Sequence, residues 1–203
     1  MSYLMKSART VCFTALWLGA IHAGDLAVED RHKGEGYLIR TRDGVLAATR
    51  GLSDAQWNFK PGQDRWSAAE IVEHLALAEE ALLANVTEDV MKRPAVEVRN
   101  GQRERDALVL ALVPDRSQRA RAVQPLIPSG RWTPRQALAR FVENRERTLG
   151  YLRAAGGLRE HVMDSPLGEP LDAFQWLLLI GGHTERHLQQ LREVTSHAGF
   201  PRR

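Results

Sequence analysis

Two histidines, His183 and His187, lie four residues apart in the segment G-G-H-T-E-R-H-L-Q-Q-L. On a helix, this spacing places both imidazoles on one face, one turn apart. Trp176 and Ile180 continue the same stripe upstream, so the pair lies on or beside a buried face. A pair placed in this way can bind a divalent metal, or it can be two ordinary core histidines with one hydrogen bond each. The spacing leaves both interpretations open.

His74 occupies a similar place in the segment I-V-E-H-L-A-L-A, in line with Ile71 and Ala78. Burying an imidazole costs desolvation unless its nitrogens find partners, and a shared divalent cation would explain three buried imidazoles directly. Three histidine ligands with an open fourth position are typical of catalytic zinc. Nickel, iron and cobalt also suit imidazole. We expect zinc or nickel first, with iron or cobalt as alternatives, although spacing alone does not bring His74 to the pair.

Other chemistry finds little support in the sequence. In the metalloprotease motif H-E-x-x-H a glutamate follows the first histidine, whereas Thr184 stands there in this chain, and Glu185 points away on a helix. Motifs for a nucleophilic Ser, Thr or Cys, a phosphate-binding Gly loop and a dinucleotide fingerprint are absent from the sequence. No general base can be identified. Two residues could orient the metal ligands, Asp172 and Gln190. Three tryptophans could line a pocket, although packing is the more common role of tryptophans near helix starts: Trp57, Trp66 and Trp132. A basic run could bind an anion, but it is better explained as a solvated loop: Arg103, Arg105, Arg116, Arg119 and Arg121.

Four helical stretches position the histidines, at about 37–52, 67–90, 133–155 and 171–196. The second begins with S-A-A-E, a capping box formed by Ser67 and Glu70. Residues 94–131 are irregular and basic, with a short helix expected at 103–112, and no period-2 strand pattern is visible. The sequence therefore predicts an all-α four-helix bundle with a long crossover between helices two and three.

The N-terminus has the three regions of a signal peptide over residues 1–23. Lys6 and Arg9 precede the apolar run T-V-C-F-T-A-L-W-L-G-A-I, and Ala23 offers a cleavage site. We expect an exported protein, periplasmic or secreted, with a leader at 24–34; an uncleaved membrane anchor or a misassigned start is the alternative. Cleavage removes two of 28 basic and none of 25 acidic residues, which lowers the formal charge from +3 to +1 and removes Cys12, the only cysteine. A near-neutral chain gives no reason to expect nucleic acid binding, and membrane contact is expected only if the segment stays uncleaved.

Three segments resemble the DinB-like (DinB/YfiT) family over a domain at about 35–199. They are W-S-A-A-E-I-V-E-H-L at Trp66–Leu75, V-P-D-R-S at Val113–Ser117, and P-L-D-A-F-Q-W-L-L-L-I-G-G-H-T-E-R-H-L-Q-Q-L at Pro170–Leu191, the most specific of the three. The resemblance implies a bundle in up-down-down-up order and a metal site formed by His74, His183 and His187. It also implies pairing through helix faces into a homodimer.

The resemblance implies an activity class as well. Family members include thiol-dependent S-transferases and maleylpyruvate isomerase-like enzymes, but their thiol cosubstrates are cytoplasmic, whereas this chain carries an export signal. We therefore expect an exported, metal-dependent small-molecule hydrolase or transferase. The alternative is a non-catalytic metal- or ligand-binding helical module.

Overall fold

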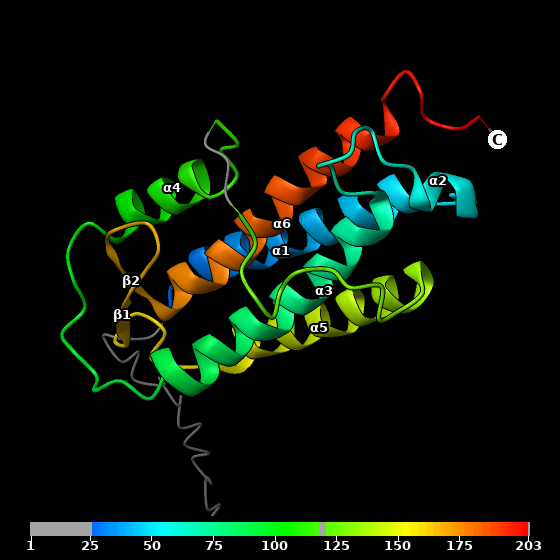
Figure 1. Ribbon diagram of the computed structural model, residues 1–203. Helices are drawn as coiled ribbons and strands as arrows, with labels where there is room; N and C mark the ends of the chain where they lie inside the picture. The colour runs from blue at the N-terminus through cyan, green and yellow to red at the C-terminus, as the bar shows by residue number, and fades with distance from the viewer. Residues whose placement is uncertain (1–25, 118–120, 203) are drawn as a thin grey trace, which may run out of the picture.

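Four long helices form the body of the protein, for which a computed structural model describes residues 26–117 and 121–202 (Figure 1). They are α1 (Val28–Thr49), α3 (Ala68–Ala84), α5 (Pro134–Ala154) and α6 (Ala173–Thr195). Shorter elements join them: α2 (Asp54–Asn58), a π-helix η1 (Asn85–Val90) that extends α3, α4 (Gln102–Leu112), and an antiparallel hairpin of β1 (Val162–Asp164) and β2 (Pro170–Asp172). The predicted signal segment lies outside the described residues. Within the part of the chain described, no helix combines the length and apolarity needed to cross a bilayer.

Three of the four long helices begin where the sequence supplies side chains that cap their free backbone N–H groups, whereas α1 has no side-chain cap. Complete capping boxes start α3 at Ser67, α5 at Thr133 and α6 at Asp172. In each box the side chain of the capping residue accepts from a backbone N–H, and the Glu or Gln three residues later bonds back to the N–H of the capping residue. These local signals explain why the predicted starts near 67, 133 and 171 agree with the structure.

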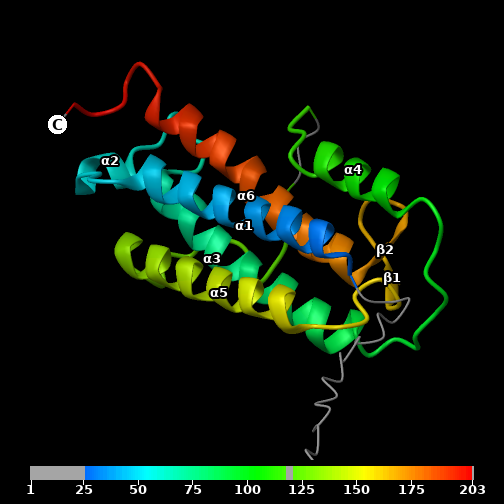
Figure 2. The ribbon, with the colours of Figure 1, turned by 180° about the vertical axis from the view of Figure 1, so that it is seen from behind.

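Contacts between the helices fix their directions. Tyr37 and Leu38 of α1 lie beside Gly181 of α6, and Gly44 lies beside Leu188 further along both helices, so α1 and α6 are parallel. Asn144 and Thr148 of α5 meet α3 in the order of the α3 sequence, at the Ala76 carbonyl and then at Glu79, so α3 and α5 are also parallel. The His74–His183 contact below shows that α3 packs on α6. Figure 2 shows α1 and α5 from the side opposite to Figure 1.

The hydrophobic core forms two clusters, one toward each end of the bundle. One cluster includes Leu38, Leu149 and Phe174, and the other includes Val45, Ile71 and Phe141, all at most 2% exposed. The four-residue and seven-residue spacing of such positions follows the helical repeat. The buried positions of the long helices therefore recur with the helical period.

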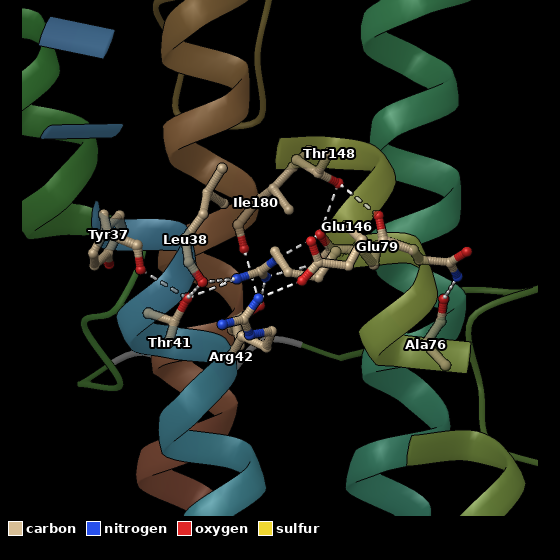
Figure 3. Close-up of polar contacts among 12 residues, drawn as sticks. Tyr37, Leu38, Thr41, Arg42, Ala76, Glu79, Glu146, Thr148 and Ile180 are labelled. Atoms are coloured by element: carbon tan, nitrogen blue, oxygen red, sulfur yellow. Dashed lines mark hydrogen bonds and ion pairs between the residues drawn. The ribbon is translucent and has the colours of Figure 1, made fainter. Parts of the chain in front are cut away.

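A buried polar layer lies between the two clusters, and Figure 3 shows its polar contacts. Arg145 and Glu79, whose side chains are at most 1% exposed, form two parallel bonds of 2.6 and 2.7 Å. Arg145 also donates to the Leu38 carbonyl and to the hydroxyls of Thr41 and Thr184, while Thr148 donates to Glu79. The layer thus draws residues from all four long helices and satisfies both buried charges.

Two expectations about the local structure were wrong. The first helix begins at Val28 rather than near Tyr37, because Glu29 and Asp30 suit a helix N-terminus and Arg31 bonds to carbonyls at the end of α5 (3.2 Å to Ala155). The hairpin was also missed, since three-residue strands are too short to show an alternating pattern. The connection between helices two and three does contain the expected short helix, and it crosses the α3–α6 side of the bundle (Figure 1).

Candidate metal centre

The structure brings His74, His183 and His187 together between α3 and α6. One ring nitrogen from each histidine lies within 4.8 Å of the other two. The ring centroids are 5.1 Å apart for His74 and His183, and 4.6 Å apart for the two pairs that include His187. In the part of the chain described, this is the one group of at least three His, Cys, Asp or Glu residues whose ligand atoms could share a metal ion. His74 is 3% exposed, and the other two are half-buried.

Hydrogen bonds fix which nitrogen two of the rings offer to this cluster. Nδ1 of His74 lies 2.8 Å from the Leu126 carbonyl oxygen, which only accepts, so Nδ1 carries the proton and donates. Nδ1 of His187 donates in the same way to Oε1 of Gln190 at 3.0 Å. In both neutral rings Nε2 therefore keeps its lone pair. Such outer partners are those that orient metal-binding histidines.

The spacing of the inner nitrogens fits a small cation. Nε2 of His74 and Nε2 of His183 are 3.2 Å apart. Two imidazoles bound to one tetrahedral zinc at 2.0–2.1 Å would have their nitrogens about 3.3 Å apart. A direct hydrogen bond between these two atoms would need a proton on Nε2 of His183, because the proton of His74 is already on Nδ1. An all-imidazole donor set of this geometry suits zinc, nickel, cobalt or iron.

Burial favours the neutral form of all three rings. Desolvation is the main cause that lowers the pKa of His74, although its bond to the Leu126 carbonyl works in the opposite direction. Desolvation also lowers the pKa of His183 well below its usual value, with further contributions from the two other rings, and lowers the pKa of His187 to about 3. Neutral imidazoles are the form that binds metals.

Trp66 supports the cluster from the residue before the α3 capping box. Its ring centroid lies 4.9 Å from that of His74 and 6.1 Å from that of His187, and it is stacked on the latter. Of the three tryptophans singled out, it is the one that contacts the site. Trp57 is buried in the core, and Trp132 packs against Arg140 with the guanidinium 4.6 Å from the ring.

Of the other candidate residues that the structure describes, only Gln190 lies at the cluster. Gln190 is the partner of His187, as described above, whereas Asp172 lies at the start of α6, where it caps the helix and pairs with Arg159 at 3.1 Å. In the basic run, Arg103 and Arg116 pair with glutamates, Arg105 bonds to the Asn100 carbonyl, Arg121 is exposed, and Arg119 lies outside the described residues. The charge of Glu185 is felt by Tyr37 of α1 rather than by the cluster. Burial is the main cause that raises the pKa of the Tyr37 phenol to about 12, and the Glu185 charge adds to it.

Sequence reasoning missed two features beside the cluster. One is the Leu126 carbonyl, because backbone groups leave no mark on the residue pattern. The other is Glu73, whose buried carboxylate accepts hydrogen bonds from the same connection. An acidic residue inside the apolar run I-V-E-H-L is the signal that could have revealed it.

The fold and the cluster together define a helical bundle with a three-histidine site of the kind that holds a divalent metal. Residues 37–191 match the model of the DinB superfamily, and the chain belongs to that family. The uncharacterized protein YuaE of Bacillus subtilis (strain 168) is 27% identical over 149 residues, which cover 71% of this chain and 86% of YuaE.

Among solved structures, the chain resembles YfiT from Bacillus subtilis, described as a probable metal-dependent hydrolase with an unusual four-helix bundle topology. The TM-score is 0.56 at 17% identity, and the match covers 87% of this chain and 91% of YfiT. The similarity to YfiT confirms the four-helix bundle that the sequence predicted.

Proposed function

We propose that the protein binds one divalent metal ion, zinc or nickel, through Nε2 of His74, His183 and His187, and that it hydrolyses a small-molecule substrate there. The observation that carries the proposal is the convergence of three neutral imidazoles, two of which have Nδ1 fixed by an outer acceptor. Iron and cobalt suit the same donors. A cation held by three imidazoles with an open position supplies Lewis acidity to a substrate oxygen or to water.

The residues of the chain supply the rest of the site. Leu126 and Gln190 hold two imidazoles in the tautomer that leaves Nε2 free to bind metal. Trp66 packs against His74 and His187 and restricts their rotation. Hydrolysis is favoured over thiol transfer because the proposed signal peptide takes the protein out of the compartment that holds thiol cosubstrates. The fold is also that of YfiT, which is described as a probable metal-dependent hydrolase.

Metal analysis tests the binding step. The chain, expressed with supplemented zinc or nickel, should hold one ion per molecule, and His183→Ala and His187→Ala should reduce that content severalfold. His32→Ala is the matched control, because His32 is exposed on α1 and outside the cluster. A wild-type chain that carries no stoichiometric metal after supplementation would contradict the proposal.

Activity screens then separate the proposed enzyme from the alternative. The metal-loaded protein should cleave a member of an ester, amide and lactone panel, and His183→Ala should abolish the cleavage. Stoichiometric metal without any hydrolysis would favour a non-catalytic metal-binding module. Mass spectrometry of the mature N-terminus tests export, since a chain that still begins at Met1 would contradict cleavage.

A further inference from the structure

The buried carboxylate of Glu73 is hydrogen-bonded to residues 129–131, in the connection that passes the candidate metal centre. Its side chain is 4% exposed. Oε1 accepts from the backbone N–H groups of Ser129 (3.1 Å) and Arg131 (3.2 Å), and Oε2 accepts from Gly130 (2.9 Å). The Arg131 guanidinium lies 3.7 Å from Oε1. A buried carboxylate is costly unless its oxygens are satisfied, and here three consecutive N–H groups satisfy them.

Three consecutive N–H groups converge on one anion only when the backbone curls around it. Gly130 provides that curl with φ of +72°, a conformation that residues with a Cβ rarely adopt. The result is an anion-binding nest, a concave arrangement of backbone N–H groups whose anion is a side chain of the same protein. The conformation of residues 129–131 therefore depends on both Glu73 and Gly130.

The same connection supplies the outer partner of a proposed metal ligand. Leu126 lies three residues before Ser129, and its carbonyl accepts from Nδ1 of His74 at 2.8 Å. Glu73 and His74 are neighbours on α3, so the interactions form a closed loop. It runs from the Glu73 carboxylate through the 126–131 backbone to the Leu126 carbonyl, and from there to the imidazole next to Glu73. A carbonyl held in place fixes both the tautomer and the rotation of the ring that it contacts.

We propose that Glu73 is a positioning residue for the metal centre. It holds the 126–131 segment so that the Leu126 carbonyl keeps Nδ1 of His74 protonated and Nε2 directed to the cluster. This inference rests on the proposed metal binding by the three histidines. Glu73 acts through the backbone and is not itself a ligand. A purely structural role, in which Glu73 only stabilises the connection, is the alternative that the experiment must exclude.

The test compares two variants at the nest with a matched glycine control. Glu73→Gln replaces one of the two accepting oxygens by a donor. Gly130→Ala strains the curl alone, because a Cβ there meets nothing within 4 Å. Gly168→Ala is the control, since Gly168 has φ of +81° and equally open space but lies at the hairpin turn. Zinc affinity is measured by competition with a chromophoric chelator, and the His74 tautomer by 15N NMR of the metal-free protein.

We expect Glu73→Gln to weaken zinc binding about 10- to 100-fold, the range that loss of an outer partner produces. Gly130→Ala should weaken it severalfold, and both variants should reduce the Nδ1–H population of His74. Gly168→Ala should lower thermal stability to a similar degree as Gly130→Ala, with affinity and tautomer unchanged.

Wild-type zinc affinity and an unchanged tautomer in both nest variants would overturn this inference while the proposed function stands. Equal loss of affinity in Gly130→Ala and Gly168→Ala would also overturn it, because general destabilisation would then explain the effect. A wild-type chain that binds no zinc would overturn the proposed function, and this inference with it. If Glu73→Gln does not fold, the glycine pair decides the question.

Discussion

At the residue scale, α6 contributes polar side chains to two different sites on neighbouring faces. One site is a completed hydrogen-bond network, and the other is the histidine cluster. Thr184 faces the Arg145–Glu79 pair, where every strong donor and acceptor finds a partner in the protein. His183 and His187, on either side of it in sequence, each place a ring nitrogen within 4.8 Å of one of His74. A network in which every polar group has a partner stabilises one arrangement of the helices, whereas imidazole nitrogens gathered at one point suit a shared metal ligand.

The closed network gives a prediction about stability. Glu79→Gln should lower the free energy of unfolding by about 3–5 kcal/mol, because it leaves the Arg145 charge buried without its carboxylate. Urea denaturation measures the effect. Glu143→Gln is the control, since Glu143 forms an exposed pair with Arg147 on α5 and should cost under about 0.5 kcal/mol. Equal effects of the two substitutions would show that the buried pair has no special weight.

At the element scale, α6 is shaped by small residues just before its histidines. A Cβ on Gly181 would lie 2.7 Å from the Tyr37 ring of α1, and a Cβ on Gly182 would lie 2.9 Å from Val113 at the end of α4. Both distances are shorter than van der Waals contact allows. The G-G pair therefore lets α1 and the start of the V-P-D-R-S connection approach α6 one turn or less from His183.

Gly182→Ala and Gly150→Ala form a matched pair that tests this close approach. Gly150 lies within α5 with open space at its Cβ, so its replacement should stabilise the protein by about 0.5–1 kcal/mol through helix propensity. Gly182→Ala brings the same gain, but it should destabilise the protein by about 1–2 kcal/mol overall, because Val113 must move. Urea denaturation of both variants measures the difference. A stabilising Gly182→Ala would show that α4 yields without cost.

At the scale of the whole molecule, the proposed metal would join helices that are distant in the sequence. His74 lies on α3, while His183 and His187 lie more than 100 residues later on α6. The 126–131 connection is attached to the same point through Leu126 and Glu73. An ion held there would tie α3, α6 and the crossover together, and it would stabilise the fold because an unfolded chain cannot present the same site.

Metal withdrawal should therefore lower thermal stability. At free zinc about 100-fold above Kd the expected gain is about 2.7 kcal/mol. For a chain of this length that gain corresponds to a Tm shift of roughly 5–10 °C, lost on chelation. Calorimetric scans with zinc and with chelator measure it. The double variant His183→Ala/His187→Ala should show no zinc-dependent shift, and a shift of equal size in that variant would place the ion elsewhere.

The sequence by itself determined the features that depend on neighbours within one helix. The capping box at Ser67 marked one helix start in the sequence, and the four-residue spacing of His183 and His187 predicted that both lie on one face. The boxes at Thr133 and Asp172, which the structure shows, are of the same local kind. These features follow from the helical repeat and from backbone groups a few residues away. The resemblance to the DinB-like family added His74 to the pair, and the structure brings all three rings together.

Tertiary structure decided which distant residues meet. The packing of α3 on α6 turns His74 toward the pair. The path of the 126–131 connection brings the Leu126 carbonyl to His74 and three backbone N–H groups to Glu73. Arg145 and Glu79 find each other in the same way, 66 residues apart. Periodicity reports the face on which a side chain lies, but it carries no information about the element that packs on that face. Only the packing of the four helices could bring these partners together.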